Sequence, residues 1–380
     1  MEIMKTYEII INPKSSSLTK FQSDTIFGHL CWALRYLHGE EELNNFIAKY
    51  KESPPILVSN GFPSGRMPRP IRNPLEREDV EKLIEEVYGS KSNENKRKGL
   101  NALKIIKKAS LVDLEVFHSI INGLSESEFI KKCLKAEICP KAMKYTTQDQ
   151  ICPLLDKRDQ EKYPEKAKCP AFSEKNKCPI LNESLKEING IKIKYPESPE
   201  ATVYKNTINR LTGRTKKEGG LFAHDETYYR EDSKISIFVK VSEDYTKEYL
   251  FNLFEFIEYS GYGKRKSTGK GHFVIKSINE FKFKAPDTPS GYVTLSNYVP
   301  APNDPIDGFY EIMIKRGKLG GHYANCKSID PFKKPLRMFR AGSVFKIKEY
   351  KEYYGSLVRN IHNINKIVHY GYAFPVSMVM

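Results

Sequence analysis

Residues 261–271, GYGKRKSTGKG, combine glycines and cations in a pattern suited to phosphate binding. Glycine lets a backbone approach a phosphate closely, and the backbone amides can then donate to its oxygens. The segment lacks the spacing of a Walker A loop, and it precedes a strand rather than a helix, unlike a dinucleotide-binding fingerprint. We predict an anion-binding loop whose contacts are Tyr262, Lys264, Arg265, Lys266, Ser267 and Lys270. A flexible basic turn is the alternative.

Two further basic segments favour contact with a polyanion. Residues 205–217 hold five basic and no acidic residues and lead into a predicted strand. Such a segment can lie along a nucleic-acid backbone, with Arg210 and Arg214 as contacts, although a solvated hairpin is equally compatible. Residues 65–70, GRMPRP, must be extended because alternating prolines exclude a helix. Arg69 is the candidate contact there, and a rigid crossing strap is the alternative.

Four cysteines lie within 40 residues, and each is followed by proline: Cys139, Cys152, Cys169 and Cys178. Their spacing differs from the C-x₂-C pairs of common zinc folds. This part of the chain is poor in large apolar residues, so a metal could replace a missing core. We expect a zinc ion held by four thiolates, with an iron–sulfur cluster or free thiols as the alternatives.

The elements that must position these segments follow a split α+β pattern. An isoleucine-rich strand at 7–11 is followed by a polar loop that starts at Lys14, Ser15 and Ser16. A helix then begins near Ser23 and stops at Gly39. The remaining elements come much later: strands at 221–229 and 234–241, a helix at 245–259 and a strand at 272–278. Together they form a ferredoxin-like βαββαβ unit.

We therefore predict two domains. Residues 1–284 form a ferredoxin-like (RRM-like) domain with an insertion at about 40–220, between its first helix and second strand. Residues 285–380 form a smaller β-rich domain, for which a degenerate copy of the same fold is one interpretation.

Charge is distributed unevenly along the 380 residues. The net charge is +15, but the segments 91–108, 205–217, 261–276 and 314–348 alone carry +25, so the rest of the chain carries −10. Basic patches on a mildly acidic body are typical of a polyanion binder. No run of about 18 apolar residues offers a membrane span, and we expect the protein in the cytoplasm.

Several of these stretches, in this order, resemble the RAMP superfamily of CRISPR systems, and more narrowly the subunit-four family of the Csm (type III-A) effector complex. The matching stretches are FQSDTIFGHLCWAL at 21–34, MPRP at 67–70, NRLTG at 209–213, GGLF at 219–222 and the glycine-rich loop. They cover much of residues 5–280, whereas residues 100–200 depart from the family pattern.

The resemblance implies a non-catalytic subunit that binds the 5′ handle of the CRISPR RNA. It also implies two protein partners, the large polymerase/nuclease subunit and the neighbouring backbone RAMP subunit. The serine-containing loop at 14–16 and the glycine-rich loop would bind the handle, and Arg210 and Arg214 would lie against the guide.

Two other functions remain open. One is the equivalent subunit of a type III-B complex. The other is a CRISPR-RNA processing endoribonuclease that uses His29 as a general base, although the sequence shows no positioned partners for this histidine.

Overall fold

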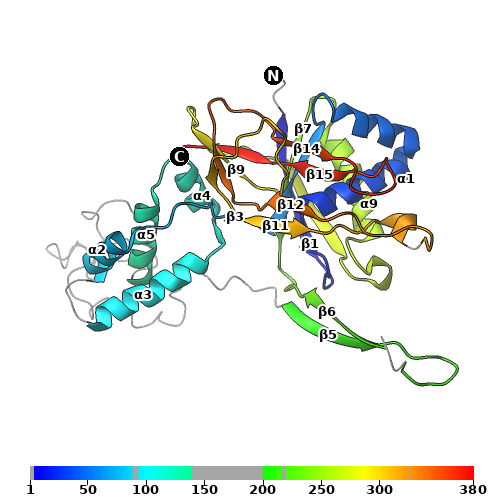
Figure 1. Ribbon diagram of the computed structural model, residues 1–380, viewed down its shortest axis with the longest axis horizontal. Coiled ribbons are helices and arrows are strands. Elements are labelled where there is room, and N and C mark those ends of the chain that lie inside the picture. The colour runs from blue at the N-terminus through cyan, green and yellow to red at the C-terminus, as the bar shows by residue number, and fades with distance from the viewer. Residues whose placement is uncertain (1–3, 89–92, 139–199, 216–219, 325) are drawn as a thin grey trace, which may run out of the picture. The chain divides into compact units, whose positions relative to one another are not determined.

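The computed structural model describes residues 4–88, 93–138, 200–215, 220–324 and 326–380 (Figure 1). The chain packs as two compact units. The first comprises Met1–Ile71, Leu111–Gly123 and Pro196–Met380, and the second comprises Arg72–Ser110 and Leu124–Tyr195. None of the helices in the described part of the chain has the length and apolar character that crossing a membrane requires.

The first unit is built on a four-stranded antiparallel sheet with the strand order β2-β7-β1-β8. Its strands are β1 (Lys5–Pro13), β2 (Ile56–Pro63), β7 (Ile235–Val241) and β8 (Phe273–Glu280). Two helices accompany them, α1 (Ser23–Lys49) after β1 and α9 (Lys247–Ser260) after β7. This succession of elements is consistent with the predicted ferredoxin-like βαββαβ plan. The mixed α+β class is confirmed.

The second strand of this sheet differs from the prediction. It is β2, which pairs with β7, whereas the predicted strand at 221–229 forms β6 (Leu221–Thr227) and pairs with β5 (Glu200–Asn206) in a separate ribbon. Ile56, Leu57 and Val58 are fully buried in β2, which is what places this strand in the sheet. The chain leaves the sheet after β2 and returns to it at β7, and we call the residues between these two strands, 64–234, the excursion. The predicted insertion at about 40–220 therefore began too early.

Helix α1 also continues further than expected. The apolar stripe at Ile26, Leu30 and Leu34 is buried as predicted, and the helical conformation is interrupted at Gly39, where the sequence predicted the stop. Gly39 adopts φ +92°, a conformation open to glycine, and helical structure resumes after this kink as far as Lys49.

Residues 291–380 are rich in short strands. A second antiparallel sheet consists of β10 (Gly308–Phe309), β13 (Val344–Lys346), β9 (Gly291–Thr294) and β16 (Pro375–Met378), in that order. Two ribbons accompany it: β11 (Ile312–Lys315) with β12 (Leu336–Phe339), and β14 (Gly355–Val358) with β15 (His369–Tyr372). An aromatic core fills this part, with Tyr292, Tyr298, Phe345 and Tyr354 almost fully buried.

This β-rich part packs against the first sheet within the same unit. The hydroxyl of Tyr370 accepts from the Val58 amide at 2.9 Å, and that of Tyr372 donates to the Tyr50 carbonyl at 2.9 Å. Packing alone therefore does not mark the boundary predicted between residues 284 and 285. That boundary, and the interpretation of 285–380 as a degenerate ferredoxin-like copy, stay predictions.

The excursion contributes to both units. In the first unit, β3 (Arg66–Pro68) pairs with β4 (Leu111–Asp113), which runs into α4 (Leu114–Ile121). The second unit contains α2 (Arg77–Tyr88), α3 (Asn93–Lys108) and α5 (Glu126–Ile138). A methyl group at Gly99 would lie 2.5 Å from Ile84 Cγ2, so glycine allows α3 to pack closely on α2.

The predicted zinc ligands Cys139, Cys152, Cys169 and Cys178 lie outside the described residues, and the zinc site stays a prediction. Within the described ranges, no group of three or more His, Cys, Asp or Glu side chains is arranged to hold a metal ion.

Candidate nucleic-acid interface

The glycine-rich loop (residues 261–271) has a defined conformation that depends on glycine. Gly271 adopts φ +68°, and a β-carbon there would lie 2.0 Å from the carbonyl oxygen of Tyr262. This close approach is used, because the Tyr262 amide donates to the Gly271 carbonyl at 3.1 Å and closes the loop at its base. Hydrogen bonding across the base favours a shaped loop over the alternative of a flexible turn.

The glycine-rich loop is held against the serine loop (residues 14–20), which follows β1. The Gly271 amide donates to the Ser16 carbonyl at 2.9 Å, and the His272 amide donates to Ser15 Oγ at 2.9 Å. At the other end, the Lys264 amide donates to Thr19 Oγ1 at 3.0 Å. The structure thus brings together two segments that the sequence analysis identified separately.

A buried carboxylate joins these loops to strand β6. Glu226 has a side chain that is 1% exposed, and it accepts from Lys270 Nζ at 2.6 Å, Ser16 Oγ at 2.8 Å and His224 Nε2 at 2.9 Å. Burial by itself raises the pKa of Glu226, but the hydrogen bonds from Lys270, His224 and Ser16 outweigh it and hold the pKa at about 2. Glu226 is therefore ionised at neutral pH and orders the base of the interface.

This network changes the role of two predicted contacts. Lys270 and Ser16 are both partly buried, and Lys270 also donates to Ser16 Oγ at 2.7 Å. Their polar groups are thus committed to Glu226, so they position the loop. Glu226 was not among the residues predicted from the sequence. The pattern that could have indicated it is the alternation of Phe222, His224 and Glu226, which places all three side chains on one face of β6, soon after a basic segment.

The tip of the glycine-rich loop carries the accessible cations. Lys264, Arg265, Lys266 and Ser267 are all exposed, as is Lys14 on the serine loop. The guanidinium carbon of Arg265 lies 5.1 Å from the ring centre of Phe222, a cation–π arrangement that restrains this side chain. The lysines and the arginine present positive charge to solvent, and their contact with RNA stays a prediction.

The prediction that Tyr262 is a contact of the anion-binding loop is wrong, because its side chain is 2% exposed. Its ring stacks on Phe21 with centroids 4.4 Å apart, and its hydroxyl donates to the Lys20 carbonyl at 2.9 Å. The ring and the hydroxyl thus both have partners inside the protein. Tyr262 belongs to the core beneath the loop.

His29 also serves this core. Its Nε2 accepts from the Gly263 amide at 3.0 Å, and its ring lies against Tyr262 with centroids 4.8 Å apart. Desolvation, together with the charge of Lys266, lowers the pKa of His29 to about 3. The ring is neutral at pH 7, and its lone pair already holds the loop, which disfavours the general-base role weighed for an endoribonuclease.

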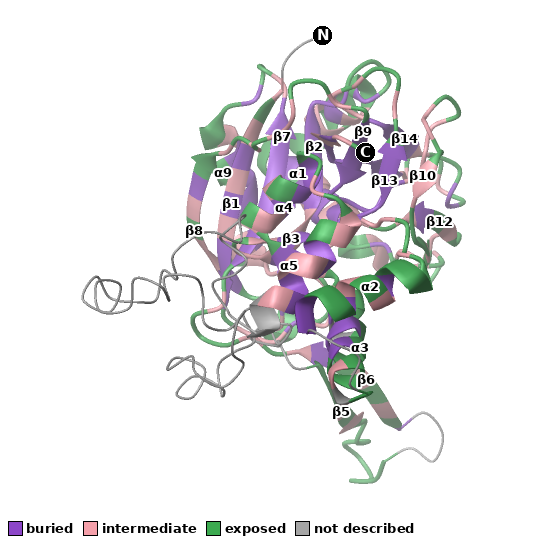
Figure 2. Cartoon of the chain, turned by 90° about the vertical axis from the view of Figure 1, so that its left-hand side faces the viewer, coloured by how far each residue is buried: buried purple, intermediate pink, exposed green. Residues whose placement is uncertain are grey.

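Strands β5 and β6 form a long two-stranded arm (residues 200–227) whose side chains are mostly exposed (Figures 1 and 2). Arg210 and Arg214 lie exposed near its tip. The tip has its own hydrogen bonds, because the Asn209 amide donates to the Arg214 carbonyl at 2.9 Å. At the base of the arm, Ser17 and Thr227 exchange backbone hydrogen bonds of 2.8 and 3.0 Å. The serine loop therefore supports the arm as well as the glycine-rich loop.

Arg69 belongs to neither of the two loops nor to the arm. It is partly buried on the extended segment after β3, where the next residue but one, Ile71, donates its amide to the Gly342 carbonyl at 2.8 Å. Because β3 pairs with β4 and Ile71 bonds to Gly342, this segment has the structural role that the sequence analysis gave as the alternative, a rigid strap that crosses other elements. An RNA contact by Arg69 stays a prediction.

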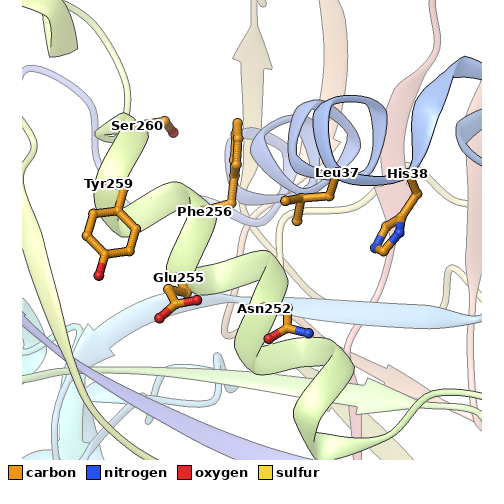
Figure 3. Close-up of a pocket in the computed structure, with 7 residues that line it drawn as sticks. All are labelled: Leu37, His38, Asn252, Glu255, Phe256, Tyr259 and Ser260. Atoms are coloured by element: carbon orange, nitrogen blue, oxygen red, sulfur yellow. The ribbon is translucent and has the colours of Figure 1, made fainter.

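A shallow groove lies between α1 and α9 and has a different character (Figure 3). Leu37 and Phe256 contribute apolar surface, Tyr259 is 81% exposed, and Glu255 adds a carboxylate. The groove has no lysine or arginine in its lining, so it is unsuited to a polyanion. Its lining combines apolar and aromatic side chains with a single carboxylate.

Comparison with known proteins identifies the family. A search of curated protein sequences finds no significant match. By structure, the chain aligns over 99% of its length with 98% of a chain in the Csm1-Csm4 cassette in complex with cA4, at 15% identity and a TM-score of 0.51. It aligns over 98% of its length with all of a chain in the Csm3-Csm4 subcomplex of the type III-A CRISPR-Cas interference complex, at 16% identity and a TM-score of 0.50. The RAMP superfamily model matches residues 14–274, which include both loops and the arm, and the chain belongs to the RAMP superfamily.

Proposed function

We propose that this protein is a non-catalytic subunit of a type III-A CRISPR effector complex and that it binds the 5′ handle of the CRISPR RNA. One observation carries this proposal: Lys264, Arg265 and Lys266 are exposed on a loop that backbone hydrogen bonds and Glu226 hold in place. Cations on a shaped loop bind phosphates with little ordering cost. The structural likeness to Csm4 supports the same assignment.

The arm extends the proposed interface. The base of the arm and the glycine-rich loop both contact the serine loop, so an RNA strand bound at the glycine-rich loop would continue along the arm towards its basic tip. Phosphate contacts from Arg210, Arg214 and Lys14 would add affinity that falls steeply with salt. Handle bases would be recognised as unstacked single-stranded bases.

The proposed partners are the large polymerase/nuclease subunit and the backbone RAMP subunit. The aligned chains come from complexes that contain Csm1 or Csm3. The groove between α1 and α9, with exposed Leu37 and Tyr259, provides an apolar surface of the kind that protein partners cover. The non-catalytic assignment is supported by the neutral, occupied His29.

A binding titration tests the proposal. Purified protein is titrated against labelled guide RNA with and without its handle, and a denaturing gel checks for cleavage. The Arg210→Ala/Arg214→Ala variant should weaken binding about tenfold without changing the melting temperature, because both side chains are exposed. The matched control, Lys282→Ala/Lys351→Ala, removes the same charge from exposed positions elsewhere.

The outcomes are distinct. Tighter binding of handled RNA without cleavage supports the proposal. Cleavage overturns the non-catalytic assignment, and equal binding of both RNAs overturns the handle assignment. Wild-type affinity in the Arg210/Arg214 variant would remove the arm from the interface.

A further inference from the structure

The ribbon of β11 and β12 continues beyond its two strands. The Leu319 amide donates to the Pro331 carbonyl at 2.7 Å, and the Lys333 amide donates to the Gly317 carbonyl at 2.8 Å. Lys318 and Phe332 form a bridge within this continuation. We call residues 312–319 together with 331–340 the basic ribbon. Most of it belongs to the fourth basic segment of the sequence, residues 314–348, which includes neither the loops nor the arm.

The two faces of the basic ribbon differ sharply. Ile314 lies opposite Arg337 in the register, so their side chains share a face, and Ile312 lies on that face as well. Ile312 and Ile314 are 56% and 73% exposed. On the other face Met338 is 1% exposed. An exposed pair of isoleucines beside an arginine is an unusual surface for an isolated protein, because it leaves apolar area in water.

Charge on the inner face is neutralised. Lys315 Nζ lies 3.0 Å from Asp24 Oδ2, and the Asp24 side chain is only 5% exposed. Lys315 also donates to Gln22 Oε1. This inner contact fixes the ribbon against the start of α1, next to the end of the serine loop.

Charge on the outer surface is not neutralised. Arg316, Lys318 and Arg337 are exposed, and none of them has a carboxylate partner among the residues that the structure describes. The guanidinium of Arg316 and the ammonium of Lys318 lie 5.2 and 5.8 Å from the ring centre of Phe332. Phe332 is itself 44% exposed. Aromatic and cationic side chains are thus interleaved on an accessible surface.

We propose that the outer face of the basic ribbon is a second RNA-binding surface, which takes a single-stranded segment adjoining the one held by the glycine-rich loop. Arg316, Lys318 and Arg337 would bind phosphates, and bases would pack on Phe332, Ile312 and Ile314. This inference rests on the proposed RNA-binding function. It adds a site in the C-terminal part of the chain.

Charge decides between RNA and a protein as the occupant. Residues 312–340 contain eight basic residues and a single acidic one, Asp330. Uncompensated arginines beside aromatic rings are the combination that single-stranded nucleic acids require, because phosphates and base faces alternate along the strand. The contact of Lys315 with Gln22 also places this ribbon beside the serine loop, so one strand of RNA can reach both surfaces.

The experiment compares two variants by titration with handled guide RNA. Arg316→Ala/Arg337→Ala should bind about tenfold more weakly than wild type, and the slope of log affinity against log salt should fall by about 1.4, the value for two lost contacts to a single strand. Lys282→Ala/Lys351→Ala should leave both quantities unchanged. As a second measurement, a photo-crosslinking residue in place of Ile314 should crosslink to the RNA.

The readouts separate the two proposals. If the wild-type protein does not bind guide RNA, the proposed function itself is contradicted. Normal wild-type binding with equal affinities and slopes for the two variants, and no crosslink from position 314, would overturn the ribbon site alone. Unchanged RNA affinity with loss of assembly onto the large or backbone subunit would show that the ribbon is a protein interface, which also overturns the inference.

Discussion

Glu226 illustrates how a single buried carboxylate can order a surface of the opposite charge. Its contacts with Lys270, Ser16 and His224 join strand β6 to two loops. A positive loop without this carboxylate would repel itself, since Lys264, Arg265 and Lys266 lie within a few residues of Lys270. One acidic residue therefore permits a dense group of cations on the loop above it.

This role predicts an acid-sensitive contribution to stability. The pKa of Glu226 is lowered to about 2, so its contribution is complete above about 4.5, its ordinary value, and is lost as the pH falls towards 2. Glu226→Gln should lower the free energy of unfolding at pH 7 by roughly 1.5–3 kcal/mol, the range for hydrogen bonds to charged groups. Denaturant unfolding at pH 7 and at pH 2.5 measures this difference.

The control for Glu226→Gln is Glu243→Gln, at an exposed position. We expect the deficit of Glu226→Gln to shrink at pH 2.5 and the control to match wild type at pH 7. A deficit of the same size at both pH values would contradict the ionic role of Glu226.

At the scale of elements, the glycine-rich loop depends on two kinds of glycine. Gly271 has a positive φ, and a side chain there would also collide with the Tyr262 carbonyl. Gly269 has a similar φ, +79°, but its side-chain position is open. Substitution of Gly269 therefore tests the cost of the positive φ alone, whereas substitution of Gly271 adds the steric clash with the Tyr262 carbonyl.

We predict that Gly271→Ala destabilises the protein much more than Gly269→Ala. Strain alone should cost Gly269→Ala about 1–2 kcal/mol, the penalty of a left-handed conformation for a residue with a β-carbon. Gly271→Ala should lose more, and it should also weaken guide-RNA binding because the base of the loop must open. Thermal unfolding and RNA titration of both variants measure the two effects. Similar losses in the two variants would show that the loop tolerates the displaced carbonyl.

At the scale of the whole molecule, the charges and the cysteines suggest separate tasks for the two parts of the chain. The candidate RNA surfaces all lie in the first unit, whereas the Cys-Pro stretch falls within the residue range of the second. A metal held by those cysteines would add to the stability of the fold.

We propose that zinc is bound there and predict about one zinc ion per chain. Cys152→Ser should lose the metal, because a four-thiolate site needs every ligand, whereas Cys326→Ser, outside the stretch, should retain it. Elemental analysis of the purified proteins provides the test. Iron with acid-labile sulfide would favour the cluster alternative, and metal-free wild-type protein would contradict both.

The sequence alone determined the positions of the elements whose apolar residues repeat at a regular spacing. The strand at 7–11, the strand at 234–241, the helix at 245–259 and the strand at 272–278 are all confirmed, within a few residues, as β1, β7, α9 and β8. Their apolar residues repeat at intervals that only one kind of element satisfies. The exposed cations of the glycine-rich loop follow from composition for the same local reason.

Long-range pairing is what only the tertiary structure decided. The sequence could not show that β2, rather than the strand at 221–229, joins the sheet, because both stretches have strand-like patterns and only their neighbours distinguish them. Burial of Tyr262 and the commitment of Lys270 to Glu226 depend on residues far away in the chain. Ser16 and Glu226, for example, are 210 positions apart. Residue type reveals what a side chain can do, but the fold determines whether it faces a ligand or another part of the protein.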